Sequence, residues 1–171
     1  MEINTVNHCK GCGGRCCMDY VVPLSIEDVK RIVENARFKP EFFVDFTPVD
    51  DMEFRCPDIR IDGLYAYMTL RRDGGGCCVF SFIDGDEMKC RIHSLHPLAC
   101  RIYPFAESDG RVAHRRKFRC ERKWNIDSGN QEGIRKLLKQ RDAEIRDYEA
   151  LALSWNKRGG GSRSQFLSFI L

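Results

Sequence analysis

Four cysteine thiols lie close together near the start of the chain, in the spacing C-x2-C-x3-C-C. They are Cys9, Cys12, Cys16 and Cys17. The residues between them are glycines, Lys10 and Arg15, so the segment contains no apolar side chain that could pack in a core. Glycines let backbone amides approach a sulfur-ligated centre closely. The pattern therefore predicts a loop that binds a metal through thiolates.

A second set of four cysteines follows on separate segments. It consists of Cys78, Cys90, Cys100 and Cys120. Eight thiolates divide into two four-ligand sites, as two [4Fe-4S] clusters or as one cluster with a structural zinc. Structural zinc usually takes two ligands from each of two C-x2-C knuckles, whereas ferredoxin-type runs concentrate them on one loop. The spacing thus favours iron–sulfur, and zinc remains the alternative.

The remaining cysteines and the basic residues have two interpretations each. Cys56 and Cys77 are expected to be small buried hydrophobic residues. Cys77 could nevertheless compete with Cys78 as a ligand because the two are adjacent. A thiolate-ligated centre carries negative charge, and the basic residues near it could offset that charge. Alternatively, these basic residues form the solvent-exposed face of a strand. The available cations are Arg15, Arg101, Arg115, Arg116 and Lys117.

Composition and charge narrow the class of protein. A chain of 171 residues with 43% hydrophobic residues is long enough for one domain. The 28 basic and 25 acidic side chains nearly cancel, so we expect no nucleic-acid partner. No apolar stretch marks a signal peptide at the start, and none reaches the roughly 18 residues of a membrane span. Free thiolates in the cytoplasm are therefore expected, rather than a secreted disulfide scaffold.

Local patterns predict two helical segments, a strand and a hairpin between the first cysteine motif and His93. Ser25-Ile-Glu-Asp28 is a capping-box start for a helix over 26–36. Pro40 and the phenylalanines after it predict a short helical turn or a hydrophobic plug against the metal loop. A strand is expected over 64–70. Residues 78–83 and 88–93 then form a predicted hairpin, with one of the cysteines on each arm.

The rest of the chain is predicted to be mainly helical. A short helix over Ser94–Arg101 would end beside Cys100, and a basic strand over 111–119 would follow. Apolar residues at helical spacing predict a long helix over about 131–156. The Gly-, Ser- and Arg-rich segment that follows is typical of a flexible linker, and it leads to a short apolar tail. That tail is either a strand or plug docked on the domain, or a tethered docking element for a partner.

These elements predict an α+β fold, a small irregular domain held together by metal. Residues 1–157 would form one metal-binding domain, with a cysteine core over 9–120. Residues 158–171 would form the linker and tail.

Several motifs in order resemble one known family. The segment from Cys90 to Phe105, with its Cys-Arg-Ile-Tyr-Pro ending, follows Cys78-Val-Phe80 and the C-x2-C-x3-C-C run. Together they resemble the YkgJ-like cysteine-cluster family of zinc- or iron-chelating domains, and are similar to the metal-binding part of flagellin lysine methylases. The resemblance covers residues 9 to 120. It departs at His93 and His96, where the family usually has tyrosine and arginine.

The expected function follows from the thiols and from what is absent. No catalytic triad, P-loop or dinucleotide fingerprint is present, so an enzyme is the less expected outcome. We expect an iron–sulfur accessory protein with two [4Fe-4S] centres, a redox-responsive or electron-transfer partner that docks on a larger protein. The resemblance implies an alternative, a cluster-dependent protein lysine methyltransferase that uses S-adenosylmethionine. A third possibility is a zinc-stabilised protein-interaction module.

Overall fold

A three-stranded antiparallel sheet forms the centre of the fold. The computed structural model describes residues 13–51, 54–108, 110–115 and 128–171. In the sheet, β3 (Leu64–Leu70) lies between β1 (Val44–Pro48) and β2 (Ile59–Ile61). The strand predicted over 64–70 is confirmed with the same bounds. The helices and short antiparallel strand pairs confirm the α+β class.

The helix predicted from the capping box is also confirmed with the same bounds, as α2 (Ile26–Ala36). The Asp28 amide donates to Ser25 Oγ at 3.0 Å, and the Ser25 amide donates to Asp28 Oδ2 at 3.1 Å. Val29 and Ile32 face the core and are fully buried. The short turn α3 (Pro40–Phe43) follows, and the one-turn 3-10 helix η2 (Val49–Asp51) comes after β1.

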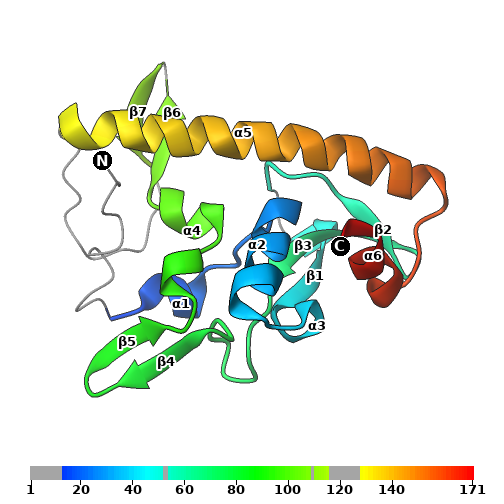
Figure 1. Ribbon diagram of the computed structural model, residues 1–171, viewed down its shortest axis with the longest axis horizontal. Helices are drawn as coiled ribbons and strands as arrows, with labels where there is room; N and C mark the ends of the chain where they lie inside the picture. The colour runs from blue at the N-terminus through cyan, green and yellow to red at the C-terminus, as the bar shows by residue number, and fades with distance from the viewer. Residues whose placement is uncertain (1–12, 52–53, 109, 116–127) are drawn as a thin grey trace.

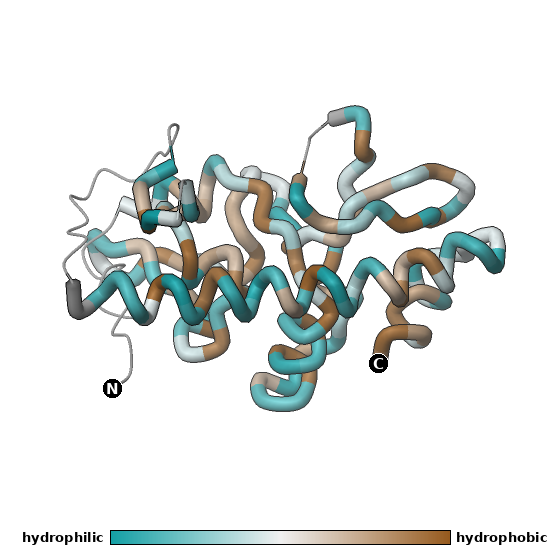
Figure 2. Tube along the Cα trace, turned by 90° about the horizontal axis from the view of Figure 1, so that it is seen from above, coloured by the Kyte–Doolittle hydropathy of each residue, from teal (hydrophilic) through white to brown (hydrophobic). Residues whose placement is uncertain are grey.

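The long helix α5 (Ser128–Lys157) runs along the whole molecule, above α4 (Leu98–Ile102), α2 and the sheet in Figure 1. Figure 2 shows hydrophobic turns alternating with hydrophilic ones along it. Its buried residues form two groups, one in the first half with Ile134, Leu137 and Leu138, and one near the end with Tyr148 and Trp155. One helix therefore contributes to two separate parts of the core.

The buried apolar residues form two clusters. The main cluster joins the sheet, α2, α3 and the end of α5. The second cluster joins the first half of α5 to α4 (Leu98–Ile102), β6 (Phe105–Ser108) and β7 (Arg111–His114). The second cluster consists of Leu98, Ile102, Phe105, Val112, Ile134, Leu137 and Leu138.

The C-terminal segment differs from the prediction. Residues 158–164 do not form a flexible linker. Gly160 has φ 74° and packs against the Arg60 carbonyl, and Ser162 begins the helix α6 (Arg163–Ile170) with a capping box to Gln165. Phe166 is fully buried in the main cluster. The tail is therefore docked on the domain, as a helix rather than as a strand.

The hairpin between Cys78 and His93 has shorter arms than predicted. β4 (Ser81–Asp84) pairs with β5 (Glu87–Cys90), so Cys78 lies just before the first arm. The helix predicted over Ser94–Arg101 is divided into η3 (His93–Leu95) and α4. Pro97 causes the break, because a residue before proline avoids helical angles and His96 accordingly has ψ 137°.

Of the basic strand predicted over 111–119, β7 takes up the first four residues, and the part from residue 116 lies outside the described residues. Among the described helices, none combines the length and apolar character needed to cross a membrane.

Candidate metal centre

The adjacent cysteines of the first motif lie on the short helix α1 (Arg15–Asp19), not on the predicted open loop. Gly14 precedes the helix with φ 70°, and its carbonyl accepts the Cys17 amide at 2.8 Å. A Cβ atom on Gly14 would lie 2.4 Å from Cγ of Met88 on β5. Only glycine therefore lets α1 approach β5 this closely, which brings Cys16 and Cys17 to the hairpin.

The loop before β4 presents Cys78 to α1. Asp73 Oδ1 accepts the amides of Gly75 and Cys77, each at 2.9 Å, and so fixes the turn. The Cys78 amide then donates to the Cys17 carbonyl at 2.8 Å. This hydrogen bond links the first and second cysteine motifs directly.

Phe80 anchors the same segment in the core. It is fully buried, and its ring contacts those of Phe38, Phe42 and Phe43 at 5.2 to 5.9 Å between centroids. The helical turn predicted at Pro40 is confirmed as α3, and Phe42 and Phe43 on it contact Phe80, two residues beyond Cys78. The Cys-x-Phe pattern therefore pairs a candidate ligand with its anchor.

Cys90 and Cys100 approach from two further elements. Cys90 is the last residue of β5, opposite Ser81, and packs against the main cluster. Cys100 lies on α4, where its amide donates to the Pro97 carbonyl at 2.9 Å. Leu98 and Ile102 bury the opposite side of this helix in the second cluster. The two candidate ligands are thus held by different parts of the core.

The thiols are close enough to change one another's pKa. A hydrogen bond from the Cys17 thiol lowers the pKa of Cys16 to about 7 and raises the pKa of Cys17. Burial raises the pKa of Cys100 well above its usual value, and the charges of Cys78, Cys16 and Cys90 add to this. Five of the eight predicted ligands therefore lie close enough to act on one another electrostatically: Cys16, Cys17, Cys78, Cys90 and Cys100.

The described residues do not by themselves form a closed coordination shell. No three of their Cys, His, Asp or Glu side chains surround one point in a way that would already hold an ion. Three predicted ligands, Cys9, Cys12 and Cys120, lie outside the described residues. Thiolate is nevertheless the kind of ligand that a thiophilic metal prefers.

Cys56 and Cys77 are both partly exposed, so neither is the fully buried residue expected from the sequence. Asp73 holds Cys77 at the surface turn through its amide. Burial, with a smaller effect of Asp58, raises the pKa of Cys56 to about 12. Cys56 lies near Tyr148, whose pKa is raised by burial and, to a smaller extent, by the charge of Cys56.

The sequence missed one cation that acts on the thiols, Arg72. Burial raises the pKa of Cys78, while hydrogen bonds from the amides of Phe80 and Ser81 and the charge of Arg72 lower it. The Arg72 side chain is fixed by a 2.6 Å hydrogen bond from Nε to the Gly76 carbonyl. Arg72 stands just before the glycine loop that leads to Cys77 and Cys78, and this position in the sequence could have identified it.

The cations predicted from the sequence have other contacts. Arg115 donates to the Tyr20 hydroxyl at 3.1 Å, which ties β7 to the segment after α1. Arg15 is exposed on α1, and the side chain of Arg101 interacts with the charges of Arg31, Asp28 and Glu144. Arg116 and Lys117 lie outside the described residues.

Two histidines lie between Cys90 and Cys100 in the chain. The rings of His93 and His96 are 4.7 Å apart in an edge-on contact. Burial lowers the pKa of His96 to about 4, with further contributions from the charges of His93 and Arg101. The His96 imidazole is therefore neutral near pH 7.

Comparison with known proteins matches most of this chain to one family. The model of the CxxCxxCC family, described as a putative zinc- or iron-chelating domain, matches residues 8–126. This range includes Cys16, Cys17, Cys78, Cys90 and Cys100 and ends before the first residue of α5. No solved structure matches the chain.

Proposed function

Because this chain belongs to the CxxCxxCC family of zinc- or iron-chelating domains, we propose that it is an iron–sulfur protein whose cysteines hold the centre. The observation that carries the proposal is that Cys16, Cys17, Cys78, Cys90 and Cys100, from four separate segments, lie close enough to act on one another. Each thiol must lose its proton to bind a metal, so metal binding here would release protons.

The surroundings of the sulfurs support iron–sulfur over zinc. Two backbone amides and one arginine act on the Cys78 sulfur. Hydrogen bonds to sulfur and nearby charge are the means by which proteins set the potential of such clusters. With Cys9, Cys12 and Cys120 the candidate ligands number eight, which matches two [4Fe-4S] centres. When bound, these centres would supply one-electron transfer.

We propose a redox-responsive or electron-transfer role beside a larger protein. Exposed apolar side chains lie on the elements around the thiols: Met18 on α1, Phe42 on α3 and Ile83 on β4. A partner that contacts Met18, the residue after Cys17, would lie close to the centre. The seven cysteines of the described residues are all free, which fits a reducing compartment such as the cytoplasm.

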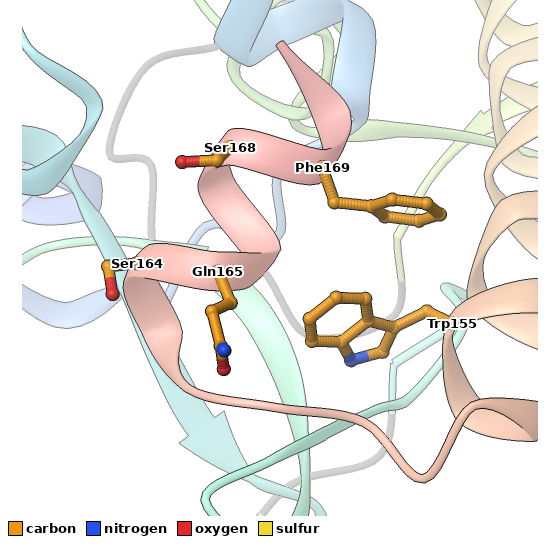
Figure 3. A pocket seen from close by; sticks show the side chains of 5 residues that line it. All are labelled: Trp155, Ser164, Gln165, Ser168 and Phe169. Atoms are coloured by element: carbon orange, nitrogen blue, oxygen red, sulfur yellow. The ribbon is translucent and has the colours of Figure 1, made fainter.

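The alternative, lysine methylation with S-adenosylmethionine, has less support. A shallow pocket of about 420 Å³, open to solvent, lies between the end of α5 and α6 (Figure 3). Trp155 and Phe169 form its apolar wall, and Ser164, Gln165 and Ser168 supply polar groups. None of the candidate cysteines in the described part of the chain lines it, so a substrate bound there would not contact these five thiols.

The test is to purify the full chain without oxygen and to measure iron, zinc and acid-labile sulfide. We expect about eight irons with matching sulfide and a visible absorbance that is lost in air. Cys78→Ser should lose metal, whereas Cys56→Ser should retain it. About two zincs without sulfide would instead favour the zinc-stabilised interaction module.

A further inference from the structure

A buried carboxylate connects α2 to the helix that carries Cys100. Asp28 is 1% exposed and lies in the first turn of α2. Its Oδ2 atom accepts the Ser25 amide of the capping box at 3.1 Å. Its Oδ1 atom accepts the Leu98 amide at 2.9 Å, across 70 residues of sequence. One side chain therefore accepts backbone hydrogen bonds at the N-terminal ends of two helices, α2 and α4.

The second contact meets a need of α4. The first amides of a helix lack partners within the helix, and the N-cap residue usually supplies one from its side chain. The N-cap of α4 is Pro97, whose side chain cannot accept a hydrogen bond. Asp28 takes this role from another part of the chain. The amide it binds belongs to Leu98, two residues before Cys100.

Arg31 holds the other side of Pro97. Its guanidinium donates to Asp28 Oδ1 and, at 3.2 Å, to the His96 carbonyl. The carbonyl before the proline and the amide after it are thus both fixed to α2. Together these contacts set where α4 begins and how it is rotated.

The charged form of Asp28 suits this arrangement better than an amide would. A carboxylate offers two acceptor oxygens, which here serve two backbone amides and one guanidinium. Asparagine has one acceptor oxygen, so it would leave one of these donors without a partner. Burying a carboxylate costs free energy of folding unless it is paired and hydrogen-bonded. An apolar side chain could fill the same space, so the carboxylate is explained by the donors that it binds.

We propose that Asp28, together with Arg31, is a positioning residue for the metal centre, because it fixes α4 so that Cys100 meets the other thiols. This inference rests on the proposed metal-binding function. It assigns a role to a part of α2 that contains no candidate ligand.

The test follows the protection of individual cysteines in the metal-loaded full chain. Each variant is purified without oxygen and treated with iodoacetamide, and the modified cysteines are identified by mass spectrometry. In Asp28→Asn we expect Cys100 to react at least about tenfold faster than in the parent protein, while Cys16 and Cys78 remain protected. Competition with a chelator should show metal affinity about 10- to 100-fold weaker.

Two control variants separate positioning from helix capping and from loss of charge. Glu27→Gln removes a carboxylate in the same turn, but this one is exposed and pairs with Lys30. Ser25→Ala removes the cap of α2 and the hydrogen bond that the Ser25 hydroxyl donates to Glu144 at 2.6 Å, and it leaves the Asp28 contact with Leu98 in place. Both should protect Cys100 as the parent protein does. If Cys100 reacts as fast in Ser25→Ala as in Asp28→Asn, the effect comes from the lost cap of α2, and the proposal is overturned.

A variant with a milder change covers the case in which Asp28→Asn does not fold. Arg31→Gln keeps Asp28 and its contact with Leu98 but removes the guanidinium, which pairs with Asp28 and donates to the His96 carbonyl, at a partly exposed side chain. It should also expose Cys100 selectively, and full protection of Cys100 in the folded variants would overturn the proposal. If the parent protein protects none of its cysteines, the metal centre itself is wrong, which is a different failure.

Discussion

At the scale of single residues, the thiols must lose protons before they can bind metal. Burial and neighbouring thiols raise the pKa of Cys17, Cys78 and Cys100, so these thiols are protonated near pH 7 in the metal-free protein. Cys16, with a pKa of about 7, is the first to ionise. A centre built from these residues is therefore coupled to pH.

We predict that metal affinity rises with pH between about 6 and 8. Each thiol that ionises on binding adds about tenfold in affinity per pH unit. Competition with a chelator of known proton affinity, at several pH values, measures the slope, and a pH indicator measures the protons released. Affinity that does not change with pH would mean that these buried thiols are not the ligands.

His96 gives the fold a separate sensitivity to acid. Its pKa in the folded protein, about 4, lies below the ordinary histidine value of 6.5. The unfolded chain therefore binds a proton that the folded chain does not. The stabilising contribution is complete above pH 6.5 and is lost as the pH falls toward 4.

We accordingly predict that His96→Gln is less sensitive to acid than the parent protein. The shift from 6.5 to about 4 corresponds to at most about 3 kcal/mol of unfolding free energy. Urea unfolding at about pH 7 and pH 4.5 measures the difference. Equal losses in the two proteins over this range would show that His96 is not held neutral in the fold.

At the scale of the elements, the contact between α1 and β5 depends on one glycine. We predict that Gly14→Ala lowers both metal content and melting temperature, because the new Cβ would collide with Met88 and the backbone has φ 70°. Gly13→Ala is the matched control, since no atom of the residues that the structure describes lies within 4 Å of its Cβ position. Similar metal content in the two variants would contradict the assigned packing of α1.

The sequence predicts an element well when the interactions that define it lie within that element, and poorly when they involve distant parts of the chain. The Ser25 capping box and the apolar spacing after it predict α2 to the residue, since both signals lie within the helix. The start of α6 carries the same kind of signal, with Ser162 and Gln165 three residues apart. The three glycines before it suggested a linker instead, because their roles as turn residues depend on contacts such as that with Arg60.

The candidate site shows the same division. The cysteine motifs predicted eight ligands without saying which share a site, and the five in the described residues lie close enough to act on one another. The short helix α1 was not predicted, because a glycine-rich segment has little helical propensity and its packing against Met88 is a tertiary effect. The link from Asp28 to Leu98 spans 70 residues, so no local pattern could reveal it.

At the scale of the whole molecule, the thiols lie where the two core clusters meet. Cys78 and Cys90 pack against the main cluster, while Cys100 lies on a helix of the second cluster. The second cluster contains seven buried residues and the main cluster contains twenty. A metal that binds all three cysteines would therefore fasten the smaller part to the larger one.

We predict that metal removal loosens the second cluster first. Hydrogen exchange followed by mass spectrometry should speed up in α4, β6, β7 and the first half of α5 after chelation. The sheet and α2 should keep more of their protection, since the main cluster holds them without metal. Protection lost first from the sheet would contradict this division.

X-ray absorption at the edge of the bound metal, recorded on the full chain purified without oxygen, tests the central claim most directly. The claim is that these cysteines converge on a sulfur-ligated centre, whichever metal is bound. We predict a first shell of sulfur alone, and a marked loss of sulfur neighbours in Cys78→Ser but not in Cys56→Ser. A first shell of nitrogen and oxygen in the parent protein, or no bound metal, would contradict it.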